Sequence, residues 1–249
     1  LSAGTSASQT GGRVFIQSGV STAQSSGALG IVTTVSGTNG VSGLMVLSTG
    51  DSKNGATGAL FVGTGSAASG RGGSISVTVG SGDSGSGGDV VVTAGGTSGG
   101  SVAGEAGGQV YLSAGTSASQ TGGRVFIQSG VSTAQSSGAL GIVTTVSGTN
   151  GVSGLMVLST GDSKNGATGA LFVGTGSAAS GRGGSISVTV GSGDSGSGGD
   201  VVVTAGGTSG GSVAGEAGGQ VYLSAGTSAS QTGGRVFIQS GVSTAQSSG

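Results

Sequence analysis

The chain has 249 residues, of which 63 are glycine and none is proline, cysteine or histidine. Charged residues make up only 6% of it and the formal net charge is -1, so it has no basic surface for nucleic acid and little charge repulsion between copies. Without histidine and cysteine it lacks the usual general base, the commonest metal ligand and disulfide bonds, which argues against an enzyme, a cofactor or a metal site.

The dominant feature is an exact internal repeat. Residues 1–111 recur without substitution as residues 112–222, and residues 223–249 begin a third copy. Self-similarity at a fixed period is typical of solenoids and other repeat arrays. Leu1 starts partway through a repeat unit. We therefore expect a single continuous domain, residues 1–249, that is a fragment of a longer array.

A shorter unit of eight residues lies inside each block, with glycine at both ends and apolar residues at its third and fifth positions. In the first block it occurs at residues 12–19, 30–37, 43–50, 58–65, 73–80, 88–95 and 108–115. Alternating apolar and β-branched residues predict a short, half-buried strand in each unit. Glycine disfavours a helix at this density.

Spacers rich in glycine, serine and threonine separate these units. The commonest spacer has seven residues, which gives a period of 15. Their composition predicts turns, and the pairs Asn39-Gly40 and Asn54-Gly55 are strong tight-turn signals. Two spacers, at residues 20–29 and 96–107, are longer, and we expect them to bulge from one edge of the stack.

The unit at residues 30–37 has two possible registers. Either Val32 and Thr34 face inward, or Ile31, Thr33 and Val35 do. The second register brings the spacing to the neighbouring units nearer the mean. The sequence does not decide between the two registers.

Strands this short cannot fold alone, so they must stack. We predict an all-β fold, a β-solenoid of short glycine-bounded strands. Each 15 residues would form one strand and one turn. The bounding glycines would turn the corners at positive φ. We favour two strands per coil, which would pair Asp89 with Arg124 and Asp200 with Arg235. A one-strand coil would instead stack Asp89 over Gln109.

The middle position of each unit points away from the predicted core, yet it carries every phenylalanine and tyrosine of the chain. A continuous apolar surface normally marks an interaction site. The alternative is a ladder of stacked aromatic rings that only protects the sheet. We call the apolar and aromatic residues at this middle position the apolar stripe. Its members are Phe15, Val46, Phe61, Val91, Tyr111, Phe126, Val157, Phe172, Val202, Tyr222 and Phe237.

Two ligand-binding alternatives follow from other side chains. Calcium-binding β-rolls need aspartates in every turn, whereas each block here has only the isolated acids Asp51, Asp83, Asp89 and Glu105. Ice-binding solenoids present regular ranks of threonine, whereas the hydroxyl side chains here form no regular rank.

The serine- and threonine-rich spacers are candidates for O-linked glycans. Stacked glycine- and serine-rich strands also suit silk-like fibrils, although the uneven spacers argue against a simple crystallite.

The segments GGRVFIQSG (11–19), GGQVYLSAG (107–115) and GGSISVTVG (72–80) resemble the glycine- and serine-rich β-solenoid repeats of secreted or cell-surface fibre and adhesin-stalk proteins. The resemblance covers the whole chain and implies a non-enzymatic extracellular or cell-surface filament, sheath or appendage. Its partners would be copies of itself or other fibre proteins, without nucleic acid or membrane insertion. The alternatives are an adhesin stalk and an ice-binding β-solenoid.

Overall fold

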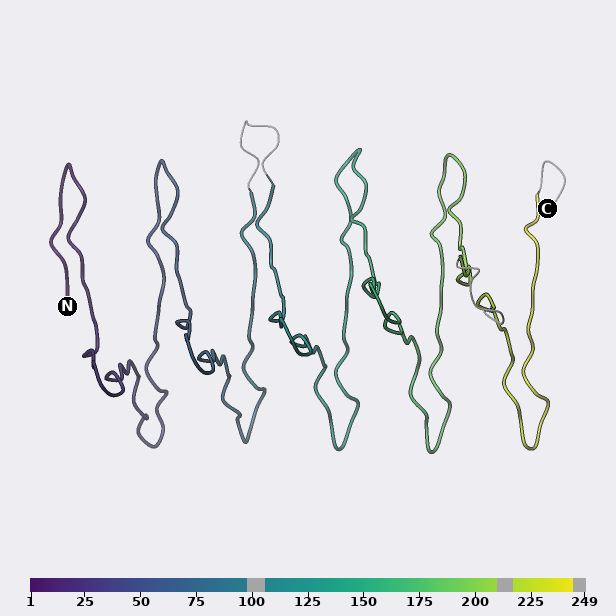
Figure 1. The fold of residues 1–249 in the computed structure, drawn as a ribbon, viewed down its shortest axis with the longest axis horizontal. Helices are drawn as coiled ribbons and strands as arrows, with labels where there is room; N and C mark the ends of the chain where they lie inside the picture. The colour runs from purple at the N-terminus through teal and green to yellow at the C-terminus, as the bar shows by residue number, and fades with distance from the viewer. Residues whose placement is uncertain (98–105, 210–216, 244–249) are drawn as a thin grey trace. The chain divides into compact units, whose positions relative to one another are not determined.

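The structure is a computed structural model that describes residues 1–97, 106–209 and 217–243. It divides into two units, Leu1–Ile127 and Gln128–Gly249. Throughout the described ranges there is no α-helix and no β-strand, and the chain consists of extended arms joined by turns (Figure 1). The predicted all-β solenoid is therefore wrong, and neither the two-strand coil nor the one-strand coil is formed.

The turns are regular, and they lie where the sequence predicts them. Each seven-residue spacer of the first block bends at its third to fifth residues, which are residues 7–9, 22–24, 53–55, 68–70 and 83–85. At several spacers the two flanking glycines meet. The amide of Gly12 donates a hydrogen bond to the carbonyl of Gly4 at 2.8 Å, and Gly123 does the same to Gly115 at 2.8 Å.

Where this closure occurs, the spacer differs from the corner of a solenoid. A solenoid corner must pass the chain on to the next coil, where a continuous ladder of main-chain hydrogen bonds begins. Here a closed spacer turns the chain back beside itself, as at the first turn after the N-terminus (Figure 1). In the described ranges the backbone hydrogen bonds close turns and do not continue along the arms.

The predicted ion pairs depended on stacked coils, and they are absent as well. Among the described residues, which include all four side chains, neither Asp89 with Arg124 nor Asp200 with Arg235 forms an ion pair. The stacking of Asp89 over Gln109 has no sheet to support it either. Within the described ranges, the main-chain hydrogen bonds between successive arms join the glycines beside a turn and do not reach these charged residues.

The first long spacer is shorter than the sequence suggests. The amide of Gly27 donates to the carbonyl of Gly19 at 2.9 Å, so the turn is the regular seven-residue stretch 20–26 and no bulge occurs there. The next arm begins at Gly27. Its third and fifth residues, Leu29 and Ile31, are 56% and 67% exposed.

These exposed fractions bear on the two registers of residues 30–37. Ile31 is less exposed than Val32, at 79%, which agrees with the second register. Val35, however, is 93% exposed and does not follow that pattern. The second long spacer, residues 96–107, is closed by a bond from Gly108 to Gly95 at 2.8 Å, and residues 98–105 lie outside the described ranges.

Positive φ angles occur at different glycines from those predicted. Within the described residues they are found inside spacers, at Gly70 (120°) and Gly85 (89°), at their second-block equivalents and at one non-glycine residue, Asn150 (66°), and not at the glycines that bound the units. In the spacers that contain Gly70 and Gly85, the fifth residue therefore adopts the left-handed region. The Asn39-Gly40 prediction is confirmed, because the amide of Gly40 closes a turn onto the carbonyl of Gly37 at 3.1 Å.

Candidate functional site

The aromatic residues of the apolar stripe are more exposed than both neighbours in most arms, whereas Val46, at 70%, is no more exposed than Leu47, at 72%. Val14 and Ile16 are 47% and 58% exposed, whereas Phe15 between them is 84% exposed. The same pattern recurs around Phe61, which is 91% exposed. An alternation in exposed fraction with the period that the sequence predicts is thus present within these single arms, even though no sheet joins them and no side chain in them is buried.

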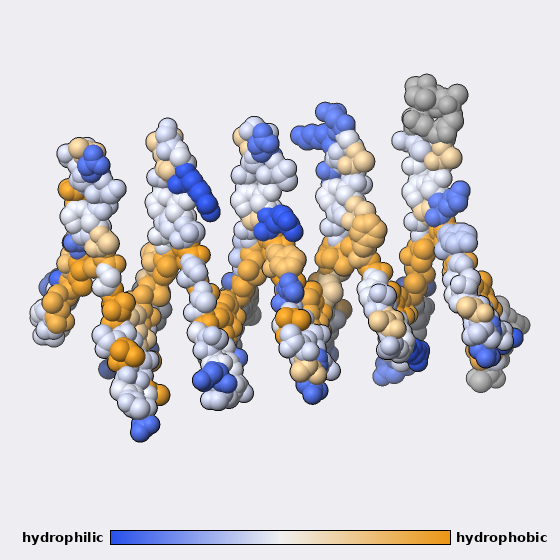
Figure 2. Space-filling view, turned by 90° about the horizontal axis from the view of Figure 1, so that it is seen from below, coloured by the Kyte–Doolittle hydropathy of each residue, from blue (hydrophilic) through white to orange (hydrophobic). Residues whose placement is uncertain are grey.

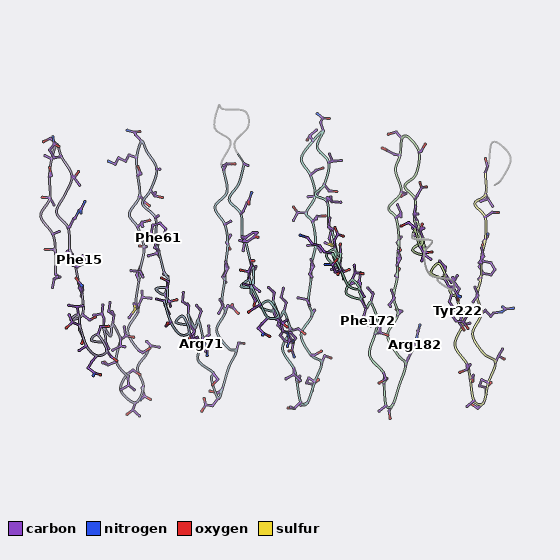
Figure 3. The ribbon with its side chains drawn as sticks, in the orientation of Figure 1. Phe15, Phe61, Arg71, Phe172, Arg182 and Tyr222 are labelled. Atoms are coloured by element: carbon purple, nitrogen blue, oxygen red, sulfur yellow. The ribbon has the colours of Figure 1, made fainter. Side chains whose placement is uncertain are left out.

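Nothing in the described part of the chain covers the stripe. No described residue is buried, and no aromatic side chain of the stripe contacts another ring. Figure 3 labels Phe15, Phe61, Phe172 and Tyr222 on the arms. The aromatic ladder that we considered as an alternative does not form in the isolated chain.

Apolar and polar side chains are segregated along the chain. Figure 2 shows hydrophobic residues gathered in the middle of the view and hydrophilic residues toward its upper and lower ends. The charged side chains Lys53 and Arg71 come from spacers, whereas Arg13 and Asp89 lie at the second position of eight-residue units, next to a bounding glycine. An apolar arm that ends in polar turns resembles an interface with an apolar centre and a polar rim.

A serine hydroxyl stabilises many of the turns, and sequence reasoning did not identify it. The Oγ of Ser6 accepts a hydrogen bond from the amide of Gln9 at 3.0 Å, and Ser117 accepts one from Gln120 at 2.9 Å. The signal is a serine at the second position of the spacer, three residues before the amide that it binds, which is a recognised local hydrogen-bonding pattern.

Replacing Ser117 with alanine should loosen its turn without unfolding any other. The lost hydrogen bond contributes about 0.5–1.5 kcal/mol, so the Gln120 amide should exchange with deuterium about 2- to 10-fold faster. Hydrogen exchange followed by mass spectrometry measures this rate. Ser119, which makes no hydrogen bond in the structure, provides the matched control. Equal effects of Ser117→Ala and Ser119→Ala would show that the hydroxyl does not stabilise the turn.

The described residues contain no other candidate centre. They hold no pocket and no group of three or more histidine, cysteine or acidic side chains that could bind a metal ion. Asp51, Asp83 and Asp89 do not come together, and Glu105 lies outside the described ranges. In the same ranges no helix has the length and apolar character needed to cross a bilayer.

The ice-binding alternative required a flat solenoid face carrying hydroxyl groups. Ser76 and Thr78 share a hydrogen bond at 3.2 Å between their own side chains, and the pair recurs in the second block. The described arms do not stack into a sheet that would arrange such pairs in ranks. The structure therefore offers no platform for this alternative.

Comparison of the chain with protein-family models, with characterised protein sequences and with solved structures finds no match. The feature with the clearest functional implication is the exposed apolar stripe.

Proposed function

We propose that this chain is a non-enzymatic structural protein that assembles with copies of itself, through the apolar stripe, into an extracellular filament, sheath or surface appendage. The observation that carries the proposal is the area that a single chain leaves exposed. The accessible surface is 24,092 Å² for a mass of 22.4 kDa. A compact monomer of this mass would expose about 9,400 Å².

Much of this exposed area is apolar. Hydrophobic residues make up 33% of the chain, yet no described residue is buried. A stable protein–protein interface needs only about 1,200–2,000 Å² of buried surface, so the uncovered area is several times what association requires. Exposed apolar surface on this scale favours association in water.

A second copy of the chain is the partner that best fits this surface. Identical 111-residue blocks present the same stripe residues at the same spacing along the sequence, so one kind of contact can recur along an assembly. A formal net charge of -1 over 249 residues gives little repulsion between copies. Both properties favour self-association over binding to an unlike, charged partner.

Sedimentation velocity over a range of concentrations, followed by electron microscopy, tests this proposal. We expect the sedimentation coefficient to rise with concentration and filaments to be visible at the upper end. A chain that remains monomeric at every concentration would overturn self-assembly. It would favour the adhesin-stalk alternative, in which binding resides in a separate head domain.

A further inference from the structure

The four asparagines of the chain share one sequence feature, which is that each is followed by glycine. They are Asn39, Asn54, Asn150 and Asn165. A glycine amide is the least hindered main-chain nucleophile, because no side chain shields its nitrogen. It can attack the side-chain carbonyl carbon of the asparagine that precedes it.

We propose that Asn54 and its equivalent Asn165 are sites of spontaneous deamidation, and that they react faster than Asn39 and Asn150. The amide nitrogen of Gly55 loses its proton to water and forms a bond to Cγ of Asn54, and the side-chain nitrogen leaves as ammonia. Water then opens the resulting cyclic imide at either carbonyl. The products are aspartate and isoaspartate, and no oxidant, reductant or cofactor is needed.

The slower pair lies in turns that are held from two sides. The amide of Gly40 donates to the carbonyl of Gly37 at 3.1 Å, and the carbonyl of Gly40 accepts from Ser36 Oγ at 2.9 Å. Both bonds recur in the second block, at the same distances. To reach Cγ of Asn39, the Gly40 nitrogen must leave the carbonyl of Gly37, and the bond from Ser36 to the Gly40 carbonyl holds the same turn against that movement.

The faster pair is held by a single, weaker restraint. The amide of Gly55 donates only to Ser52 Oγ, at 3.1 Å, and Gly166 donates to Ser163 at 3.1 Å. This acceptor is an exposed side-chain hydroxyl that water can replace. Freeing the Gly55 nitrogen therefore costs one side-chain hydrogen bond. Freeing the Gly40 nitrogen costs the main-chain bond that closes its turn, and the Ser36 bond to the Gly40 carbonyl opposes the same movement.

Deamidation would change the charge of the turns. Each event converts a neutral side chain into a carboxylate in a chain whose formal net charge is -1. If the proposed function holds, ageing would add repulsion between assembled copies. The rate of deamidation can be measured whether or not the chain assembles, so its outcome is independent of the proposed function.

Tryptic digestion separates the two classes of asparagine, because Lys53 lies between Asn39 and Asn54. Peptide 14–53 has the same sequence as peptide 125–164, and peptide 54–71 the same as peptide 165–182, so each measurement averages both blocks. The full chain is incubated at neutral pH, and the mass change from NH₂ to OH is followed in both peptides. A parallel incubation in guanidinium chloride gives the intrinsic rates without the turns.

We expect the ratio of the Asn54 rate to the Asn39 rate to be about 2- to 10-fold higher in the native chain than in denaturant, which is the effect of one additional hydrogen bond. Ser36→Ala together with Ser147→Ala should reduce this ratio by accelerating Asn39. Equal ratios in the native and denatured chains, or a lower native ratio, would overturn the proposal.

Discussion

Replacing the aromatic residues of the apolar stripe with serine should abolish self-association. The variant changes Phe15, Phe61 and Tyr111 together with their equivalents in the later repeats. Burying one such side chain contributes about 1.5–3 kcal/mol. Three of them in each block contribute enough that the concentration needed for assembly should rise by at least about a thousandfold, at 1.4 kcal/mol per factor of ten. Sedimentation velocity measures this concentration directly.

The chain offers a matched control for this experiment. Several valines lie in spacers, are as exposed as the stripe, and should not touch a partner along an arm. They are Val20, Val41, Val131, Val152 and Val242. Replacing all five with serine should change the assembly concentration only slightly. If the valine variant loses assembly as completely as the aromatic variant, general hydrophobicity rather than the stripe drives association.

The local structure could be predicted from the sequence because it depends on local chemistry. The alternation around Phe15 follows from the two-residue period of an extended chain, which operates within a single arm. The turns follow from glycine, serine and asparagine, whose backbone preferences act over three or four residues. The Asn39-Gly40 turn is one example, and its closing hydrogen bond links residues 37 and 40.

The arrangement of the arms could not be predicted in the same way. A spacer that turns a corner and a spacer that turns the chain back use the same residues, because both need small, flexible side chains. What distinguishes them is whether Gly12 meets Gly4 of its own turn or a residue of another coil. That choice depends on hydrogen bonds between distant segments, and composition does not encode them. The same reasoning placed positive φ at the bounding glycines rather than at Gly85.

The candidate site was predictable only as a set of residues. The exposure of Phe61 and its neighbours agrees with the alternation in the sequence. The serine hydrogen bonds at the turns were missed because Ser117 is one of many serines in the spacers. Only the geometry of the turn shows that its hydroxyl accepts a hydrogen bond from the Gln120 amide.

The two glycines that close a turn have different requirements, and substitution should reveal the difference. A Cβ added at Gly123 would lie 3.0 Å from the nitrogen of Gly115, whereas a Cβ at Gly115 would meet nothing within 4 Å. The first contact involves main-chain atoms, which can give way only by distorting the 2.8 Å hydrogen bond between the two residues. Gly123→Ala should therefore open the turn, and Gly115→Ala should leave it closed.

The two substitutions should in fact act in opposite directions. Gly115→Ala reduces the freedom of the open chain at a position with no steric penalty, which should stabilise the turn by about 0.4–1 kcal/mol. Gly123→Ala removes a hydrogen bond that contributes about 0.5–1.5 kcal/mol and adds the cost of displacing the backbone. Hydrogen exchange of the amide at position 123 should therefore slow in the first variant and accelerate about tenfold in the second, which corresponds to a loss of about 1.4 kcal/mol. If the exchange rate of this amide changes in the same direction in both variants, the closed turn does not require a residue without a side chain at position 123.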